Sequence, residues 1–279
     1  MKWLLHIRLA LYLGSGAIGF TALGLAVLGY WWSPASPLIR DEPALLMSVG
    51  DVEGASHAYL EQASGWGSDS EREEALWRAA RIEAVELRSR TRAIEILEEF
   101  QDAWPDSAHR ADAFALLAEL YEPVQQVRSE TESQTAYETR VRRAARTWKR
   151  AVAADPEHPQ AGDWLVRSAV LWTEVGQLQR ADATWRMASA YDDRRIEALM
   201  AIAGTQLADA PARAYRGFSH VLSEASSQGD ATLARLGMAT ALERMERYMD
   251  AEEAIDLALS EDLDDPALAQ RKRRLETIR

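Results

Sequence analysis

The chain has 279 residues, 47% of them hydrophobic, and it has no cysteine, so disulfides and thiolate metal sites are excluded. Its formal net charge is −12. An acidic chain of this kind argues against nucleic acid as the main partner, because neutralising phosphates requires clustered lysine and arginine. Glycine and proline are few, at 15 and 9 residues, which favours an all-helical chain.

The N-terminal region predicts a membrane anchor. No charged residue occurs between Leu9 and Ile39, and the apolar run Leu9–Trp32 is 24 residues long. At about 1.5 Å per helical residue, this run is long enough to cross a hydrocarbon layer of about 30 Å. Lys2 and Arg8 precede the run, so the positive-inside rule places the N-terminus in the cytoplasm and the rest of the chain outside.

A cleaved signal peptide is the alternative interpretation of this region, with Ser33-Pro34-Ala35 as a processing site. The apolar run is longer than the roughly 7–15 residues of a signal peptide, which favours an uncleaved anchor. Either interpretation exports the bulk of the chain. We therefore expect a single-pass protein of the inner (plasma) membrane, with a periplasmic or otherwise extracytoplasmic domain after the span.

A stripe of small residues runs along the predicted span at spacings of 4, 3, 4 and 3. Its members are Ser15, Gly19, Ala22, Ala26 and Gly29. Such stripes let two helix backbones approach closely in lipid, so they can mark a contact with a second helix. Small residues are also common in membrane helices in general, and the sequence leaves both interpretations open.

One pattern recurs five times after the span: a small residue, a large or apolar one four positions later, and an apolar or small one seven positions later. The five trios are Ala93/Leu97/Phe100, Ala144/Trp148/Ala151, Ala181/Trp185/Ala188, Ala214/Phe218/Val221 and Ala251/Ile255/Ala258. Their first residues are 51, 37, 33 and 37 positions apart. Pro105 and Pro156 each follow an opening alanine by twelve residues.

This pattern resembles the tetratricopeptide repeat (TPR) family, whose helical hairpins recur about every 34 residues with small, aromatic and proline positions in this order. The resemblance covers roughly residues 44–270, and its best units are 93–121 and 159–190. It implies an all-α fold in which TPR-like hairpins stack into a right-handed α-solenoid after the transmembrane helix. The physical basis is that a single hairpin cannot bury its own apolar face, whereas a stack of hairpins can.

The pattern gives five segments and about five to six hairpins. The segments are a cytoplasmic N-terminus (1–8), a transmembrane helix (9–32), a linker (33–43), the repeat domain (44–270) and a basic C-terminal tail (271–279). The 51-residue step predicts an inserted loop near Glu122–Gln134. Ser70, followed three residues later by Glu73, predicts a capped helix start.

The resemblance also implies a binding surface, because TPR arrays hold peptides or protein segments against the concave surface formed by the first helix of each hairpin. The positions that match this surface are Arg78, Ile82, Glu86, Asp112, Glu119, Asp163, Val166, Val170 and Glu174. These residues are a mixture of apolar and acidic types. They would suit an extended or helical segment with apolar and basic side chains.

No pattern typical of catalysis is present. The five histidines lie about fifty residues apart and form no ligand set. There is no phosphate-binding glycine loop, so we expect no enzyme, no cofactor and no metal. A basic run is predicted on one long helix: Arg140, Arg142, Arg143, Arg146, Lys149 and Arg150. It is either a solvated face or a docking surface for an acidic partner or lipid headgroups.

Taken together, the sequence predicts a membrane-anchored TPR scaffold that mediates protein–protein interactions in a bacterial cell envelope. The alternative is a periplasmic holding chaperone associated with the secretion machinery. The identity of the partner, the oligomeric state and the pathway are left open by the sequence.

Overall fold

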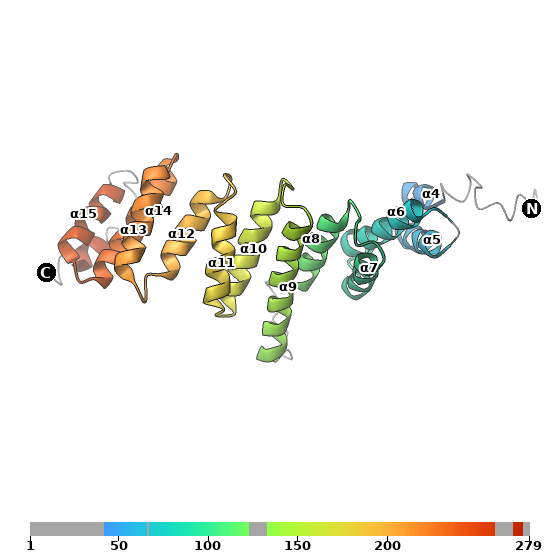
Figure 1. The fold of residues 1–279 in the computed structure, drawn as a ribbon, viewed down its shortest axis with the longest axis horizontal. Helices are drawn as coiled ribbons and strands as arrows, with labels where there is room; N and C mark the ends of the chain where they lie inside the picture. The colour runs from blue at the N-terminus through green and yellow to red at the C-terminus, as the bar shows by residue number, and fades with distance from the viewer. Residues whose placement is uncertain (1–41, 66, 123–132, 260–269, 276–279) are drawn as a thin grey trace, which may run out of the picture. The chain divides into compact units, whose positions relative to one another are not determined.

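The computed structural model describes residues 42–65, 67–122, 133–259 and 270–275 (Figure 1). Within these ranges every regular element is helical, as predicted for an all-α chain. The chain divides into two compact units, Met1–Trp104 and Pro105–Arg279, and each is described by itself. The predicted span 9–32 and its small-residue stripe lie outside the described residues. Among those that are described, no helix combines the length and apolarity that crossing a bilayer requires.

The first unit contains two helical hairpins. Its elements are α4 (Glu42–Ser48), α5 (Val52–Ser64), α6 (Asp69–Arg81), the π-helical turn η1 (Ile82–Glu86) and α7 (Arg90–Ala103). Each helix packs against the next along the chain, and η1 lies against both α5 and α7. The short helix α4 therefore forms the first helix of a hairpin with α5.

The second unit contains four hairpins, which follow one another from green to red in Figure 1. Its helices are α8 (Arg110–Tyr121), α9 (Gln134–Ala154), α10 (Ala161–Glu174), α11 (Leu178–Ala188), α12 (Arg195–Thr205), α13 (Pro211–Glu224), α14 (Gln228–Arg244) and α15 (Tyr248–Leu259). Each again packs against its successor. The two units give six hairpins in the described residues, which confirms the predicted repeat architecture.

All fifteen side chains of the five trios are buried. Each opening alanine is fully buried on the second helix of its hairpin, and so is Trp148, the largest side chain of the set. A methyl side chain lets two helix backbones approach closely, while the larger residue one turn later fills the space that the crossing helices leave. The repeat pattern is thus the pattern of the core.

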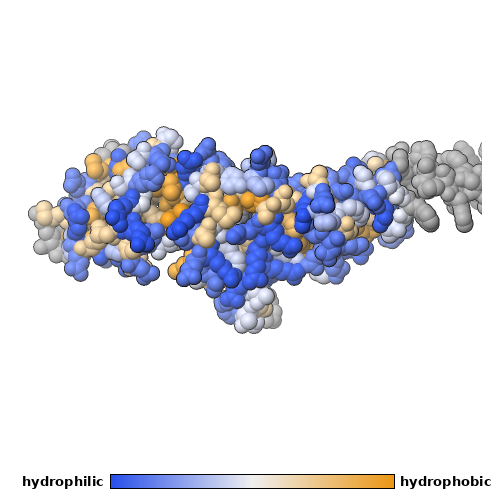
Figure 2. Space-filling view, in the orientation of Figure 1, coloured by the Kyte–Doolittle hydropathy of each residue, from blue (hydrophilic) through white to orange (hydrophobic). Residues whose placement is uncertain are grey.

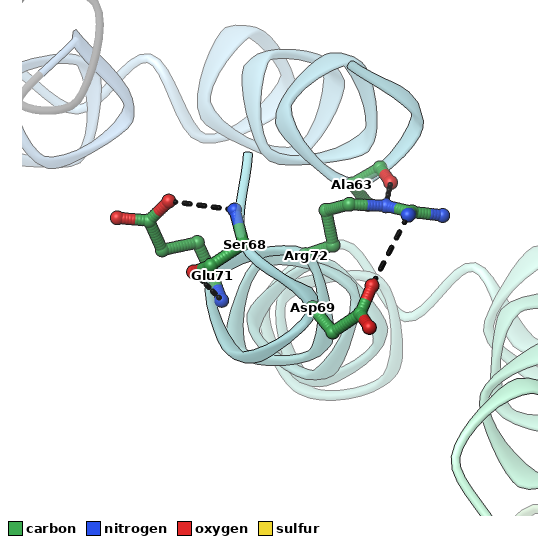
Figure 3. Close-up of polar contacts among 5 residues, drawn as sticks. All are labelled: Ala63, Ser68, Asp69, Glu71 and Arg72. Atoms are coloured by element: carbon green, nitrogen blue, oxygen red, sulfur yellow. Dashed lines mark hydrogen bonds and ion pairs between the residues drawn. The ribbon is translucent and has the colours of Figure 1, made fainter. Parts of the chain in front are cut away.

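The turn between α5 and α6 shows how a helix start is fixed, and it corrects one prediction (Figure 3). The N-cap of α6 is Ser68: its Oγ accepts from the backbone N–H of Glu71 at 3.3 Å, and the Glu71 carboxylate accepts from the backbone N–H of Ser68 at 3.0 Å. Ser70, the predicted cap, lies inside the helix. Two overlapping boxes fit this stretch, and the one that forms places Asp69 in the first turn, where the helix dipole favours an acid.

The same turn is tied to the preceding helix by Arg72. Its Nε donates to the carbonyl oxygen of Ala63 at 3.1 Å, and its Nη1 lies 3.4 Å from a carboxylate oxygen of Asp69 (Figure 3). The last carbonyls of a helix have no partner within it, so this bond satisfies one that α5 leaves open. Arg72 therefore fixes the end of α5 against the start of α6.

Two turns of the second unit have residues that suit their geometry. Gly176 lies between α10 and α11 with a φ of +69°, a left-handed conformation that strongly favours glycine. Pro211 occupies the first position of α13, where its missing N–H costs no hydrogen bond. The inserted loop predicted near 122–134 corresponds to the step from α8 to α9, and its residues 123–132 lie outside the described ranges.

The first residues of the predicted tail pack against the last hairpin. Residues 270–275 are helical, and Leu275 is buried with Leu242 and Ile255 of α14 and α15. Arg271 pairs with Glu243 at 2.8 Å and donates to the hydroxyl of Thr240 at 2.8 Å. The predicted boundary at residue 271 therefore falls inside a segment that belongs to the fold.

A buried acid marks the first unit. The side chain of Glu83 in η1 is almost entirely buried; it accepts a hydrogen bond from the hydroxyl of Ser56 at 2.6 Å and pairs with the Nε of Arg92 at 3.3 Å. These contacts join α5, η1 and α7. A buried carboxylate is costly unless it is paired and hydrogen-bonded, so both partners matter to this unit.

We predict that Arg92→Ala lowers the free energy of unfolding by about 1–2 kcal/mol, because the Glu83 carboxylate then loses its cation while it remains buried. The double variant Arg92→Ala/Glu83→Gln should recover part of that loss, since no buried charge is left uncompensated. Chemical denaturation followed by circular dichroism measures both. Equal stability of Arg92→Ala and the parent chain would contradict the structural role of the pair.

Two helical glycines of the second unit give a matched prediction. A Cβ added at Gly237 of α14 would lie 2.5 Å from the ring of buried Phe218, whereas a Cβ added at Gly204 of α12 would meet nothing within 4 Å. We expect Gly237→Ala to destabilise by about 1–3 kcal/mol through overpacking, and Gly204→Ala to stabilise by about 0.4–1 kcal/mol. Thermal melts of the two variants should shift in opposite directions. A shift in the same direction would contradict the packing of α13 on α14.

Candidate functional site

The candidate site is the outward face of the first helices, which are α8, α10, α12 and α14 in the second unit. Side chains of neighbouring first helices also form ion pairs with one another. Arg167 of α10 reaches Glu119 of α8 at 2.7 Å, and Arg194, the N-cap of α12, pairs with Asp163 of α10. In the second unit, the first helices α8, α10 and α12 therefore lie beside one another.

In the first unit, the structure changes the prediction. Ile82 is buried where η1 packs against α5 and α7, so its side chain belongs to the core and not to a binding surface. Arg78 is half-exposed; it donates to the hydroxyl of Tyr59 at 3.3 Å and to Glu74 at 2.7 Å, and these hydrogen bonds raise its pKa. Glu86 is exposed. Arg78 and Glu86 remain accessible in this unit.

In the second unit, each predicted acidic residue has a partner within the chain. Asp112 lies 3.4 Å from the Nε2 of His158, and Glu119 and Asp163 pair with the arginines named above. Glu174 accepts a hydrogen bond from the hydroxyl of Tyr137 at the start of α9. The surface is therefore less acidic toward an incoming partner than its composition suggests.

Arg167 is the centre of this network, and the sequence did not single it out. It pairs with both Glu119 and Glu122, and its guanidinium carbon lies 4.3 Å from the centroid of a Trp148 ring. The indole Nε1 of Trp148 donates to Glu122 in turn. Because a planar guanidinium can stack on an aromatic ring and hold two carboxylates at once, this one side chain joins α8, α9 and α10.

The two predicted valines remain open to solvent. Val170 is 50% exposed and Val166 is partly exposed, and both lie on the outward side of α10. They occupy positions 11 and 15 residues before the opening alanine of their hairpin, Ala181. Counting back from an opening alanine thus identifies outward positions on the first helix.

Counting back on the next two hairpins, with position 18 in place of position 11, identifies further exposed or partly exposed residues that were not predicted. Positions 18 and 15 before Ala214 are Ile196 and Leu199 on α12, and both are partly exposed; the equivalent pair before Ala251 is Leu233 and Leu236 on α14. Leu233 is 55% exposed. The distance from the opening alanine is the sequence signal that locates these four residues.

We call Val166, Val170, Ile196, Leu199, Leu233 and Leu236 the apolar strip. Its members come from α10, α12 and α14, and α12 also packs directly on α14. Exposed apolar side chains that recur on neighbouring helices favour a surface that covers another apolar group. Among the described residues, no cluster of histidines and carboxylates could hold a metal ion.

No protein-family model matches the chain, and no curated protein matches it. Solved structures do. YrrB, described as a TPR protein with an unusual peptide-binding site, aligns with a TM-score of 0.52 and 14% identity over 78% of this chain and 99% of its own. TTC0263, a thermophilic TPR protein of Thermus thermophilus, aligns with a TM-score of 0.38 and 19% identity over 72% of this chain and 95% of its own. The likeness to YrrB concerns the fold alone: this chain is an all-α array of TPR-like helical hairpins.

Proposed function

We propose that the chain is a membrane-anchored scaffold that holds a protein segment against the apolar strip of its second unit. The observation that carries the proposal is the strip itself, in which exposed or partly exposed aliphatic side chains recur on three successive first helices. Repeat arrays of this kind use such surfaces to hold extended or helical segments, and they are typically not enzymes. YrrB, which shares the fold, is described by its peptide-binding site.

The pairing of the acids defines the partner more closely. Asp112, Glu119 and Asp163 are engaged by His158, Arg167 and Arg194, so a basic partner would have to compete with side chains already in place. An apolar segment faces no such competition. The proposed ligand is therefore a segment that presents several aliphatic or aromatic side chains, with basic residues as a secondary feature.

The place of action in the proposal is a bacterial cell envelope, and its support is the sequence. The charge-free run Leu9–Trp32 has the length of a transmembrane helix, and Lys2 and Arg8 precede it. In this arrangement the repeat units are exported and remain tethered to the inner membrane. A holding chaperone would use the same apolar strip, but it would accept many unfolded chains instead of a few folded partners.

Topology gives one prediction. The full chain fused at its C-terminus to alkaline phosphatase should show phosphatase activity, because this enzyme is active only after export. The same chain fused to a fluorescent protein that folds only in the cytoplasm should not fluoresce. Reversal of the charge at both Lys2 and Arg8 should reduce export in the first fusion. A bright fluorescent fusion together with inactive phosphatase would overturn the proposed location.

The strip gives a second prediction. In affinity purification of the detergent-solubilised full chain, Val170→Asp/Leu233→Asp should lower the amount of co-purified partner about tenfold, because two carboxylates would be buried against apolar groups. The matched control is Leu178→Asp on α11, since Leu178 is 50% exposed but lies on a second helix. Equal recovery from parent, double variant and control would contradict the strip as the binding surface.

The same preparation separates scaffold from chaperone. A scaffold should recover a few folded proteins in a fixed ratio to the chain. A chaperone should instead suppress the aggregation of unrelated unfolded proteins, and the double variant should lose that activity.

A further inference from the structure

A second surface lies on α9 and α11, away from the apolar strip. α9 carries the basic run predicted from the sequence, and the structure divides that run into engaged and open members. Arg142 pairs with Glu138 at 2.7 Å, Arg143 stacks over the Tyr121 ring at 4.1 Å, and Arg150 stacks over the Phe114 ring at 4.4 Å. These three arginines stabilise α9 against its own surroundings.

Arg146 and Lys149 are different. Together with Arg180 and Ala183 of α11 and with Trp172 of α10, they line a shallow hollow of about 460 Å³. Within the described ranges, no carboxylate lies within ion-pairing distance of Arg146, Lys149 or Arg180. Three cations thus converge on one hollow without an anion among the described residues.

Contacts around the hollow hold Arg180 in place and occupy the nearest acid of α11. Trp172 is buried, and the guanidinium carbon of Arg180 lies 4.9 Å from the centroid of its ring, which holds Arg180 at the rim. Asp182, next to Ala183 on α11, is engaged by Arg186 at 2.7 Å. Like charges brought together in this way repel one another, so the arrangement is stabilised by an anion bound between them.

We propose that this hollow, lined by Arg146, Lys149 and Arg180 over Trp172, binds an acidic segment of a partner protein through its aspartate and glutamate carboxylates. Arginine holds a carboxylate through two parallel hydrogen bonds, and lysine adds a point charge.

The size and charge of the surroundings favour a short acidic segment over other anions. A nucleic acid would need a long row of cations to neutralise successive phosphates, and the chain as a whole carries −12. An anionic membrane is an extended plane, so it would repel the acidic remainder of the chain while it contacted three cations. The face over α9 and α11 is predominantly hydrophilic in Figure 2, as expected for a polar contact.

This site uses second helices, whereas the apolar strip uses first helices, so the failure of one proposal leaves the other intact. The test uses the full chain and a short fluorescein-labelled peptide in which glutamate alternates with glycine, with the glutamine–glycine peptide as the uncharged probe. Fluorescence anisotropy measures binding. We expect the glutamate peptide to bind, with an affinity that falls as salt rises, and the glutamine peptide not to bind.

Arg146→Glu/Lys149→Glu should weaken binding of the glutamate peptide at least about tenfold, because two attractive contacts become repulsive. The matched control is Arg213→Glu/Arg216→Glu on α13, which makes the same change in charge with two exposed arginines of the next second helix. Circular dichroism checks the folding of each variant. If the reversed variant does not fold, Arg146→Gln/Lys149→Gln replaces it.

Three results would overturn the proposal. Equal weakening in the α9 and α13 variants would mean that the peptide responds only to total charge. Absence of binding to the parent chain would mean that the hollow holds no acidic segment. Phosphatidylserine vesicles that bind the parent chain and lose binding in the α9 variant, while the glutamate peptide is unaffected by that substitution, would assign the hollow to a lipid surface.

Discussion

The fold depends on one packing constraint, which is that a methyl group and a large side chain one turn apart must meet a neighbouring helix at close range. Ala144 and Trp148 on α9 satisfy it with both side chains fully buried, and Ala251 and Ile255 on α15 satisfy it in the last hairpin. A larger residue at the alanine would push the backbones apart, and a smaller one at the tryptophan would leave a cavity. Because each hairpin buries its apolar face only against its neighbours, this local constraint sets the position of every helix relative to the next within a unit.

The same constraint determines which side chains are available for binding. Once the second helix is fixed by its opening alanine, the first helix is held at one rotation, and the residues 18, 15 and 11 positions earlier face outward or toward the next first helix. Val170 and Leu233 are exposed for this reason, while Ala203, at the last of these positions in its hairpin, is buried against Phe218. The arginines of the first and second helices differ in whether they pair with an acid. Arg167 and Arg194 neutralise acids on the first helices, whereas Arg146 and Arg180 stay open on the second helices.

Much of the fold follows from the sequence because apolar spacing is a local property. The five trios follow from residue type and position alone, and all of them are buried. The candidate site was less accessible. The outward exposure of Val170 follows from the repeat register, but the burial of Ile82 depends on a π-helical turn that packs between α5 and α7, and no local signal marked that turn. The role of Arg167 was also hidden, because its two acidic partners lie 45 and 48 residues away and meet it only after the hairpins stack.

The central claim is that, on α12 and α14, distance from the opening alanine decides which side chains are accessible. The chain has no cysteine, so single cysteines report accessibility without a background. The measurement is the rate of maleimide modification of the folded chain with one cysteine in place of Ile196, Leu199, Leu233 or Leu236, against one in place of Ala198, Ala203, Ala234 or Ala241. The first set, exposed or partly exposed, should react much faster than the second, which is buried in the structure and reacts only through transient opening. Similar rates in the two sets, or faster reaction in the second, would contradict the account.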